Sequence, residues 1–209
     1  MYAHTAIICY LAGWWFTDYW LSDTNYQLAS NAYSRFSILY SALCFIGVAS
    51  LIPGVYADAM LPTQIIRVTT CIYLLYFAAV IDFKTRLIPN RIPLFMFVVA
   101  ACTYIAEYKA GYEESLFPAL LGTLWCFLCF MTLWLLAHGG FGFGDVKLLT
   151  VMGFTLGYDD IMEVLIWSCI IAVAVFLILV IAKKMGLRDA LPLAPFFFIG
   201  TLLKYALGW

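Results

Sequence analysis

Long apolar runs, broken by short polar connections, dominate this chain. The clearest runs cover residues 37–55, 64–82, 92–107, 117–137, 161–182 and 192–208. A helix that crosses a bilayer needs about 17–25 mostly apolar residues. Of the 209 residues, 66% are hydrophobic and 11% are charged, whereas soluble domains carry about 25% charged residues. The chain is therefore expected to be all-α, a polytopic bundle of transmembrane helices.

Two further stretches leave the number of spans open. Residues 2–17 are apolar but contain His4, and residues 146–158 are short and carry Gly153 and Gly157. The second stretch is expected to form a short or tilted span. We predict about eight spans, within a range of six to eight. The N-terminus lacks a charged segment followed by a cleavable apolar one, so no removable signal peptide is predicted.

The distribution of charge predicts an orientation in the membrane. Basic residues follow the run 64–82, recur at Lys147 and cluster again in residues 183–189, while the connections between them are acidic. Lys and Arg are enriched in cytoplasmic connections. The basic connections are therefore expected to face the cytoplasm. No basic run is typical of nucleic-acid binding, and no nucleic-acid partner is predicted.

Two aspartates lie at the ends of apolar runs that are expected to share one membrane face. Asp82 ends the run 71–81, and Asp145 follows a glycine-rich stretch, residues 139–144. Two carboxyls at one level can share a proton, because like charges a few ångströms apart do not both ionise easily. The ionised one then activates a water, and the protonated one polarises a peptide carbonyl. The pair predicts an aspartic protease that uses no metal and no cofactor.

Glycines and prolines near these aspartates have predicted structural uses. Gly142 and Gly144 have no Cβ, so the backbone of an unwound substrate is expected to approach them closely. Pro89 breaks the helix after Asp82, since proline cannot donate to a helical carbonyl. Pro192 and Pro195 are expected to do the same before the last run.

Each feature also has an ordinary structural interpretation. Asp82 alone fits an interfacial charge paired with Lys84 or Arg86, and Asp145 alone fits a helix cap. The glycines alone fit helix packing, and Lys147 alone fits an interfacial anchor. These interpretations explain the features one at a time but not their combination.

The cysteines give no sign of a metal or redox site. Only Cys126 and Cys129 form a C-x-x-C pair, and they lie inside the apolar run 124–136. A single pair in a lipid-embedded helix is a weak zinc or redox signal. We interpret the cysteines as small apolar residues that fill helix contacts.

The combination of motifs resembles the type IV prepilin peptidase family, the bacterial relatives of the preflagellin peptidases. Asp82 is followed by Ile88-Pro89-Asn90, and then comes Gly142-Phe143-Gly144-Asp145-Val146-Lys147, which contains the G-x-G-D signature shared with presenilin-type proteases. Leu191-Pro192-Leu193-Ala194-Pro195-Phe196 resembles the family's proline-containing segment, with Ala194 in place of the usual glycine. The resemblance covers residues 65–209, expected to be the catalytic membrane domain, and leaves 1–64 as an N-terminal transmembrane region of uncertain span number.

The resemblance implies an activity and a place. Family members remove the short basic leader of type IV pilin or pseudopilin precursors at the cytoplasmic face of the bacterial inner membrane. It implies Asp82 and Asp145 as the catalytic residues. Those implied to bind substrate or shape the site are Gly142, Gly144, Lys147, Pro89 and Asn90. Longer members also methylate the new N-terminus and carry an insert with two C-x-x-C pairs, which no connection here is long enough to hold. A peptidase alone is expected; methylation and oligomeric state stay open.

Two other functions remain open from the sequence. A proton- or ion-coupled transporter would use Asp82 and Asp145 as a carboxylate relay. A scaffold protein of a secretion or pilus machine would need no chemistry, and it would leave the paired aspartates unexplained.

Overall fold

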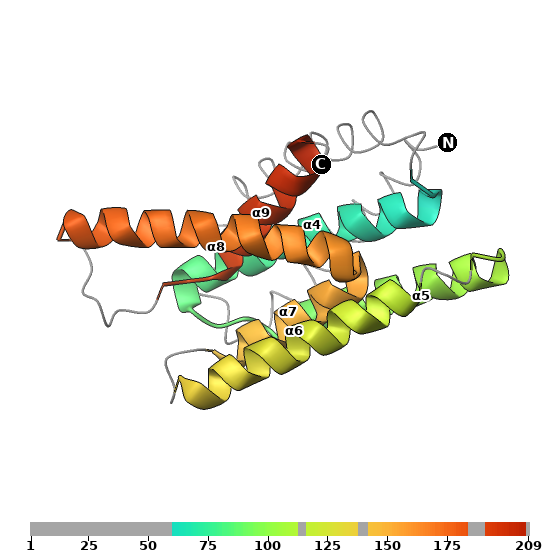
Figure 1. The fold of residues 1–209 in the computed structure, drawn as a ribbon, viewed down its shortest axis with the longest axis horizontal. Coiled ribbons are helices and arrows are strands. Elements are labelled where there is room, and N and C mark those ends of the chain that lie inside the picture. Colours follow the sequence, from blue (N-terminus) through green and yellow to red (C-terminus); the bar gives the residue numbers. More distant parts are fainter. Residues whose placement is uncertain (1–59, 113–115, 138–141, 184–190, 208–209) are drawn as a thin grey trace, which may run out of the picture. The chain divides into compact units, whose positions relative to one another are not determined.

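The computed structural model describes residues 60–112, 116–137, 142–183 and 191–207. From Pro62 onward they belong to one compact unit. This part of the chain contains helices and connections but no strand, and successive helices run back and forth (Figure 1). The helices are α4 (Pro62–Thr85), α5 (Arg91–Lys109), α6 (Leu116–Leu136), α7 (Phe143–Leu156), α8 (Tyr158–Ile181) and α9 (Ala194–Leu207). The all-α prediction is confirmed here, while the runs predicted at 2–17 and 37–55 lie outside the described residues.

Four of these helices, α4, α5, α6 and α8, are long and apolar enough to cross a membrane. The apolar part of α9, Ala194–Tyr205, is shorter. Helix α7 has 14 residues, which rise about 21 Å at 1.5 Å per residue, less than the roughly 30 Å of a hydrocarbon core. The chain is thus a multi-spanning membrane protein, and the predicted short segment at 146–158 is a short helix.

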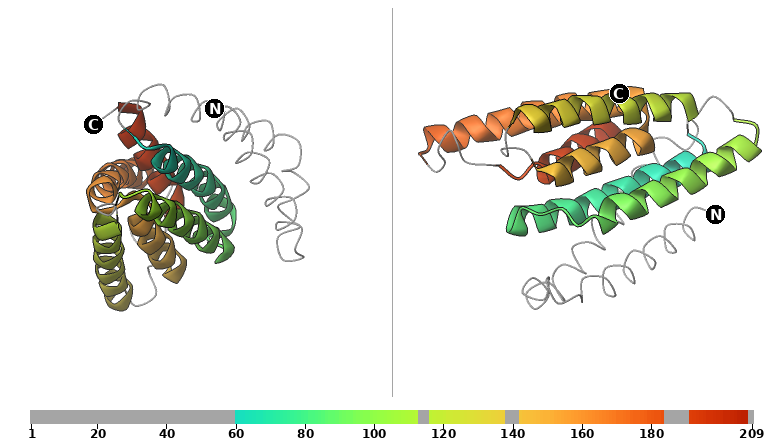
Figure 2. Two further views of the ribbon diagram at one scale, coloured as in Figure 1. Left: turned by 90° about the vertical axis from the view of Figure 1, so that its right-hand side faces the viewer. Right: turned by 90° about the horizontal axis from the view of Figure 1, so that it is seen from below.

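Helix α7 is the most enclosed part of the described bundle. It packs against α4, α5, α6 and α8. The helices lie side by side, and their axes run in similar directions (Figure 2). Helices α6 and α8 are only slightly buried and expose large apolar side chains. Such surfaces suit lipid, which accepts apolar side chains but no unpaired backbone groups. The buried residues of α7 are Val146, Leu148, Leu149, Met152, Gly153, Phe154, Thr155 and Leu156.

Glycines allow the helix backbones to approach closely at two places. A Cβ added at Gly122 of α6 or Gly153 of α7 would collide with the backbone of the other residue. Small residues at such positions are the usual means of tight helix packing in membranes. Gly157 alone separates α7 from α8 and has a φ of 84°, which L-residues with side chains rarely adopt. These glycines bring α7 against its neighbours and turn the chain sharply into α8.

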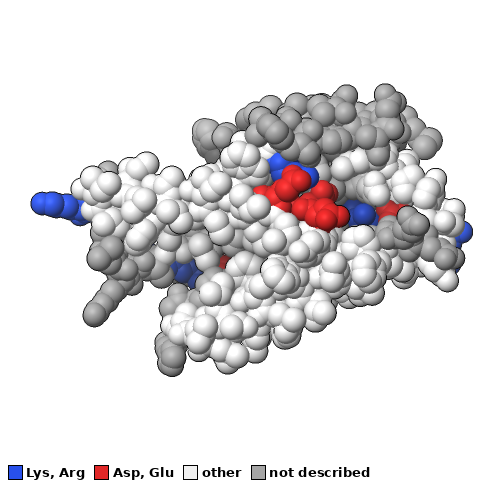
Figure 3. Space-filling view, in the orientation of Figure 1, with Lys and Arg blue, Asp and Glu red and all other residues white. Residues whose placement is uncertain are grey.

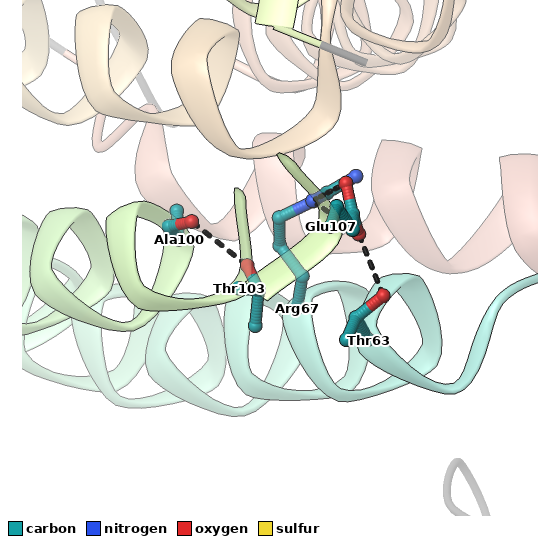
Figure 4. A network of polar contacts seen from close by, with 5 residues as sticks. All are labelled: Thr63, Arg67, Ala100, Thr103 and Glu107. Carbon is teal, nitrogen blue, oxygen red and sulfur yellow. Dashed lines mark hydrogen bonds and ion pairs between the residues drawn. The ribbon is translucent and has the colours of Figure 1, made fainter. Parts of the chain in front are cut away.

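A buried ion pair links α4 to α5 at the end of the bundle opposite Asp82. Arg67 Nη1 donates to Glu107 Oε1 at 3.0 Å and to Oε2 at 3.2 Å, and Thr63 Oγ1 donates to Glu107 Oε1 at 2.7 Å (Figure 4). The guanidinium also lies 3.8 Å from the centroid of the Tyr104 ring. Arg67 lies 15 residues before Asp82 on α4, which is about 22 Å along the helix.

A second polar cluster links α8 to α9 at this same end. Lys204 Nζ pairs with Asp160 Oδ1 at 3.2 Å and also with Glu163, and the Tyr205 hydroxyl donates to Asp160 Oδ2 at 2.7 Å. Acidic side chains gather near the middle of the face seen in Figure 3, with basic side chains beside them. Buried charges are tolerated when they are paired in this way.

We predict that Glu107→Ala lowers the free energy of unfolding by about 3–5 kcal/mol, because it leaves Arg67 buried without its carboxylate. Unfolding in detergent micelles measures the change. Glu163→Ala is a matched control, since the Glu163 side chain is 42% exposed and Lys204 keeps Asp160. The control should lose clearly less stability. Equal losses in the two variants would contradict a special role for the buried pair.

We also predict that Gly153→Leu destabilises the bundle by roughly 1–3 kcal/mol or more, because its side chain has no space against α6. The melting temperature in detergent should fall. Ala174→Leu adds the same bulk at an exposed position of α8 and should leave the melting temperature nearly unchanged. A Gly153→Leu protein as stable as this control would show that the close approach is not required.

Candidate active site

Asp82 lies in the last turn of α4 and is 5% exposed. Its carboxylate Oδ2 accepts the backbone N–H of Ala194 at 3.1 Å. Ala194 is the first residue of α9, where a helix has no internal partner for its N–H. The described partner of Asp82 is thus a backbone donor, whereas the ordinary interpretation expected a basic side chain. This bond joins the end of α4 to the beginning of α9.

The chain reverses directly after Asp82. Helix α4 ends at Thr85, Arg86 has a φ of 54°, and α5 begins at Arg91. The predicted helix break at Pro89 is confirmed, because this residue lies in the connection between the two helices. Asn90 is the N-cap residue of α5, but its side chain makes no capping hydrogen bond, which leaves its amide oxygen available for another contact.

Asp145 is the third residue of α7, and its own N–H donates to the Gly142 carbonyl at 3.1 Å. A Cβ on Gly142 would lie 2.9 Å from Asp145 Oδ2, so only glycine leaves room for this carboxyl to fold back toward the Gly142 N–H. This is half of the capping box known at helix N-termini. The other oxygen, Oδ1, is buried and has no partner among the described residues.

Two contacts hold the α4–α5 connection against the first turn of α7. The first is the bond from Lys147 Nζ to Asn90 Oδ1 at 3.0 Å; within α7, the same Nζ lies 4.8 Å from the centroid of the Phe143 ring. A Cβ on Gly144 would lie 3.3 Å from the Cβ of Ile88, which is tighter than ordinary packing. These contacts bring the end of α4 to the beginning of α7, and with them the two aspartates.

The glycines therefore have an observed use that differs from the predicted one. The space beside Gly142 is taken by the Asp145 carboxyl, and the space beside Gly144 is taken by Ile88. Both glycines allow close packing within the protein. Their predicted role as a strip for the substrate backbone stays a prediction.

Asp145 is electrostatically coupled to Asp82. It lies outside the four helices long enough to cross the membrane. Burial is the larger cause and the negative charge of Asp82 the smaller cause that together raise the pKa of Asp145 from 3.8 to about 7, while the Gly142 backbone opposes the shift. The carboxyl therefore titrates near neutral pH, as expected for one member of a pair that shares a proton.

The described residues offer no obvious metal site. No group of three or more His, Cys, Asp and Glu side chains within them is placed to hold an ion. Cys126 and Cys129 are both free cysteines on α6, one buried and one half-buried.

The contribution of the segment before α9 was not predicted from the sequence. Pro192 and Pro195 were interpreted as helix breakers within a segment that resembles one of the family, but the hydrogen bond from the Ala194 backbone to Asp82 was not expected. A signal was present in the pattern: prolines have no N–H, so Leu193 and Ala194 carry the only backbone donors in residues 192–195. The contact of Ile88 with Gly144 was not predicted either, because packing between the α4–α5 connection and α7 leaves no local pattern.

We predict that the stability of the protein falls as the pH rises from about 4 through 7. Because the pKa of Asp145 in the folded protein, about 7, lies above its ordinary value of 3.8, the folded state keeps a proton that the unfolded chain releases in this window. Asp145→Asn should abolish this part of the fall. Unfolding of both proteins in detergent between pH 4 and 8 measures it, and a constant difference across the window would contradict the assignment.

Comparison with known proteins finds relatives of this chain. A model described as the type IV leader peptidase family matches residues 69–178, which include both aspartates. The prepilin leader peptidase/N-methyltransferase of Bacillus subtilis (strain 168) is 34% identical over 138 residues, 66% of this chain and 54% of that protein. The protein of that name from Burkholderia pseudomallei (strain 1026b) is 30% identical over 132 residues, 62% of this chain and 42% of that protein.

The chain spans about half the length of the curated relatives that it matches. No solved structure matches it. The family model covers more than half of the chain, from α4 to α8. The chain therefore belongs to the type IV leader peptidase family.

Proposed function

We propose that this chain is an intramembrane aspartyl endopeptidase that removes the basic leader of type IV prepilin-like precursors. The observation that carries the proposal is the meeting of Asp82 and Asp145, far apart in the sequence, at one end of the bundle. After burial, the negative charge of Asp82 is the second cause that raises the pKa of Asp145. Curated relatives named prepilin leader peptidase support the substrate class.

The proposed chemistry needs only a water and the two carboxyls. The ionised carboxyl takes a proton from water as the water oxygen bonds to the scissile carbonyl carbon. The protonated carboxyl gives its proton to the carbonyl oxygen, and a neutral tetrahedral diol results. The first carboxyl then passes its proton to the leaving nitrogen as the C–N bond breaks, and the second carboxyl recovers a proton from the diol.

The position of the pair suits a substrate that is half in the membrane. Asp82 lies at the end of a helix long enough to cross the bilayer. An apolar pilin helix beside the bundle would remain in lipid, while its basic leader would extend into water. The cut would fall at the junction of these two parts, which is the level of the carboxyls.

We further propose that the site faces the cytoplasm, from a bacterial inner membrane. Arg86, Arg91 and Lys183 lie in or beside the connections at the end of the bundle that holds the pair. Asp159, Asp160 and Glu163 lie near the opposite end. An excess of Lys and Arg marks cytoplasmic connections. Whether the product is methylated stays open.

A carboxylate relay in a transporter receives no specific support from the structure. Such relays place ionisable side chains along a path through the membrane interior. The described pair instead lies together at one end of α4 and α7, and the buried charges at the other end are engaged in ion pairs.

The central prediction is that Asp82→Asn and Asp145→Asn each reduce cleavage of a prepilin-like precursor at least about 100-fold, since each removes one proton-transfer group. Purified protein in detergent, incubated with precursor and followed by gel, measures it. Asp159→Asn changes an exposed carboxylate near the opposite end and should cut at the wild-type rate. Substantial cleavage by either site variant would refute the proposal.

The orientation predicts a labelling pattern. Leu87→Cys and Tyr112→Cys place single thiols on the exposed connections at the two ends, in a protein whose seven native cysteines are replaced by alanine. In spheroplasts, an impermeant maleimide should label Tyr112→Cys but reach Leu87→Cys only after lysis. The opposite pattern would place the site outside the cell.

A further inference from the structure

The two carboxyls are held by different numbers of hydrogen-bond donors. Asp82 Oδ2 accepts the Ala194 N–H at 3.1 Å, and the Leu193 N–H acts on the same carboxyl from the neighbouring position. Donors that bond a carboxylate favour its ionised form. These two N–H groups also belong to the start of a helix, where the macrodipole favours a negative charge.

The sequence around these donors leaves them no other use. Pro192 and Pro195 contribute no N–H, and the first residue of a helix has no carbonyl partner within it. The first turn of α9 carries no charged side chain. The start of α9 therefore gives Asp82 uncharged backbone donors, and the fixed φ angles of Pro192 and Pro195 restrict the backbone that carries them.

Asp145 has a different environment. Its Oδ2 lies near the Gly142 N–H, while Oδ1 is buried and has no partner among the described residues. An unpaired charged oxygen away from water is costly. A proton on Oδ1 removes the charge and creates an O–H donor, which can point at a substrate carbonyl.

We infer that Asp145 holds the proton that the pair retains and donates it to the scissile carbonyl oxygen, whereas Asp82, held by the N–H of Ala194, stays ionised and takes the proton from the attacking water. This assignment rests on the proposed peptidase function. That function requires one carboxyl to donate a proton and one to accept a proton, and the assignment says which aspartate does each. Ala194 is a positioning residue that acts through its backbone on Asp82.

The charged groups around the pair agree with this division. Burial disfavours the charged form of both Asp82 and Asp145. At Asp82 this is opposed by the positive charge of Arg86, at the end of α4. Lys147 on α7 is engaged by Asn90, and Arg91 at the start of α5 is exposed. Helix α9 adds only backbone donors. Among the described residues, Arg86 is thus the positive charge that acts on the pair, and it favours ionisation of Asp82.

The first test needs no substrate. The infrared C=O stretch of a protonated carboxyl is measured against pH in Asp82→Asn and in Asp145→Asn. The spectrum of the Asp82→Asn/Asp145→Asn double variant is subtracted from each, so that only the remaining aspartate contributes. Each single variant lacks the partner's charge, so the comparison reports the surroundings of the remaining carboxyl. The Asp145 carboxyl should titrate at least about one pH unit above that of Asp82. Equal or reversed midpoints would overturn the assignment.

The second test concerns Ala194. Proline fits the first position of a helix but lacks the N–H, whereas glycine keeps it. In Ala194→Pro the acidic limb of the kcat/KM profile against pH should move up by about one unit while the alkaline limb stays. Ala194→Gly should keep both limbs in place. A purely structural defect would lower the rate equally at every pH, and unmoved limbs in Ala194→Pro would reject the positioning role.

The two tests separate the inference from the function on which it rests. If Ala194→Pro does not fold, the infrared midpoints decide alone. Reversed midpoints in a protein that cuts precursor would overturn the division of roles and leave the peptidase function intact. A protein that cuts no precursor would overturn the function, whatever the midpoints.

Discussion

The hydrogen bond from the Ala194 backbone to Asp82 connects the first described helix to the last. It closes the bundle at the end where α4 stops and where α7 and α9 begin. A buried carboxylate is expensive unless donors satisfy it, and the start of α9 supplies such donors without adding a positive side chain. The position of α9 and the state of Asp82 therefore depend on each other. The contacts of Lys147 with Asn90 and of Gly144 with Ile88 add α7 to this junction.

Buried charges are paired with opposite charges at one end of the bundle but not at the other. Away from the site, Arg67 is matched by Glu107, and Lys204 is matched by Asp160 and Glu163. These pairs hold neighbouring helices together and leave little to react. At the site, the charge of Asp82 acts on the carboxyl of Asp145, and one oxygen of that carboxyl lacks a partner among the described residues. Perturbed titration at an incompletely satisfied cluster is typical of functional sites, whereas the paired end contributes stability.

Much of this protein could be predicted from local patterns. The apolar runs correspond to α4, α5, α6, α8 and α9 within a few residues of each end, because a bilayer requires continuous apolar helices. Pro89 correctly marked the break before α5. The short segment at 146–158 was expected, and its sharp exit follows from the positive φ of Gly157. The ordinary interpretation of Asp145 was also partly right, since its carboxyl does fold back on the helix N-terminus.

The sequence by itself determined the fold class and the membrane environment, and it selected the two aspartates as candidate catalytic residues. It could do so because hydropathy, helix-breaking residues and short motifs are properties of neighbouring residues. Only the tertiary structure decided what those residues touch. It showed that Gly142 and Gly144 make room for Asp145 and Ile88, that Asn90 accepts a hydrogen bond from Lys147, and that the backbone of Ala194 binds Asp82. Except for that of Gly142 with Asp145, these contacts join segments far apart in the chain, and backbone donors and shape complementarity leave almost no mark on amino-acid identity.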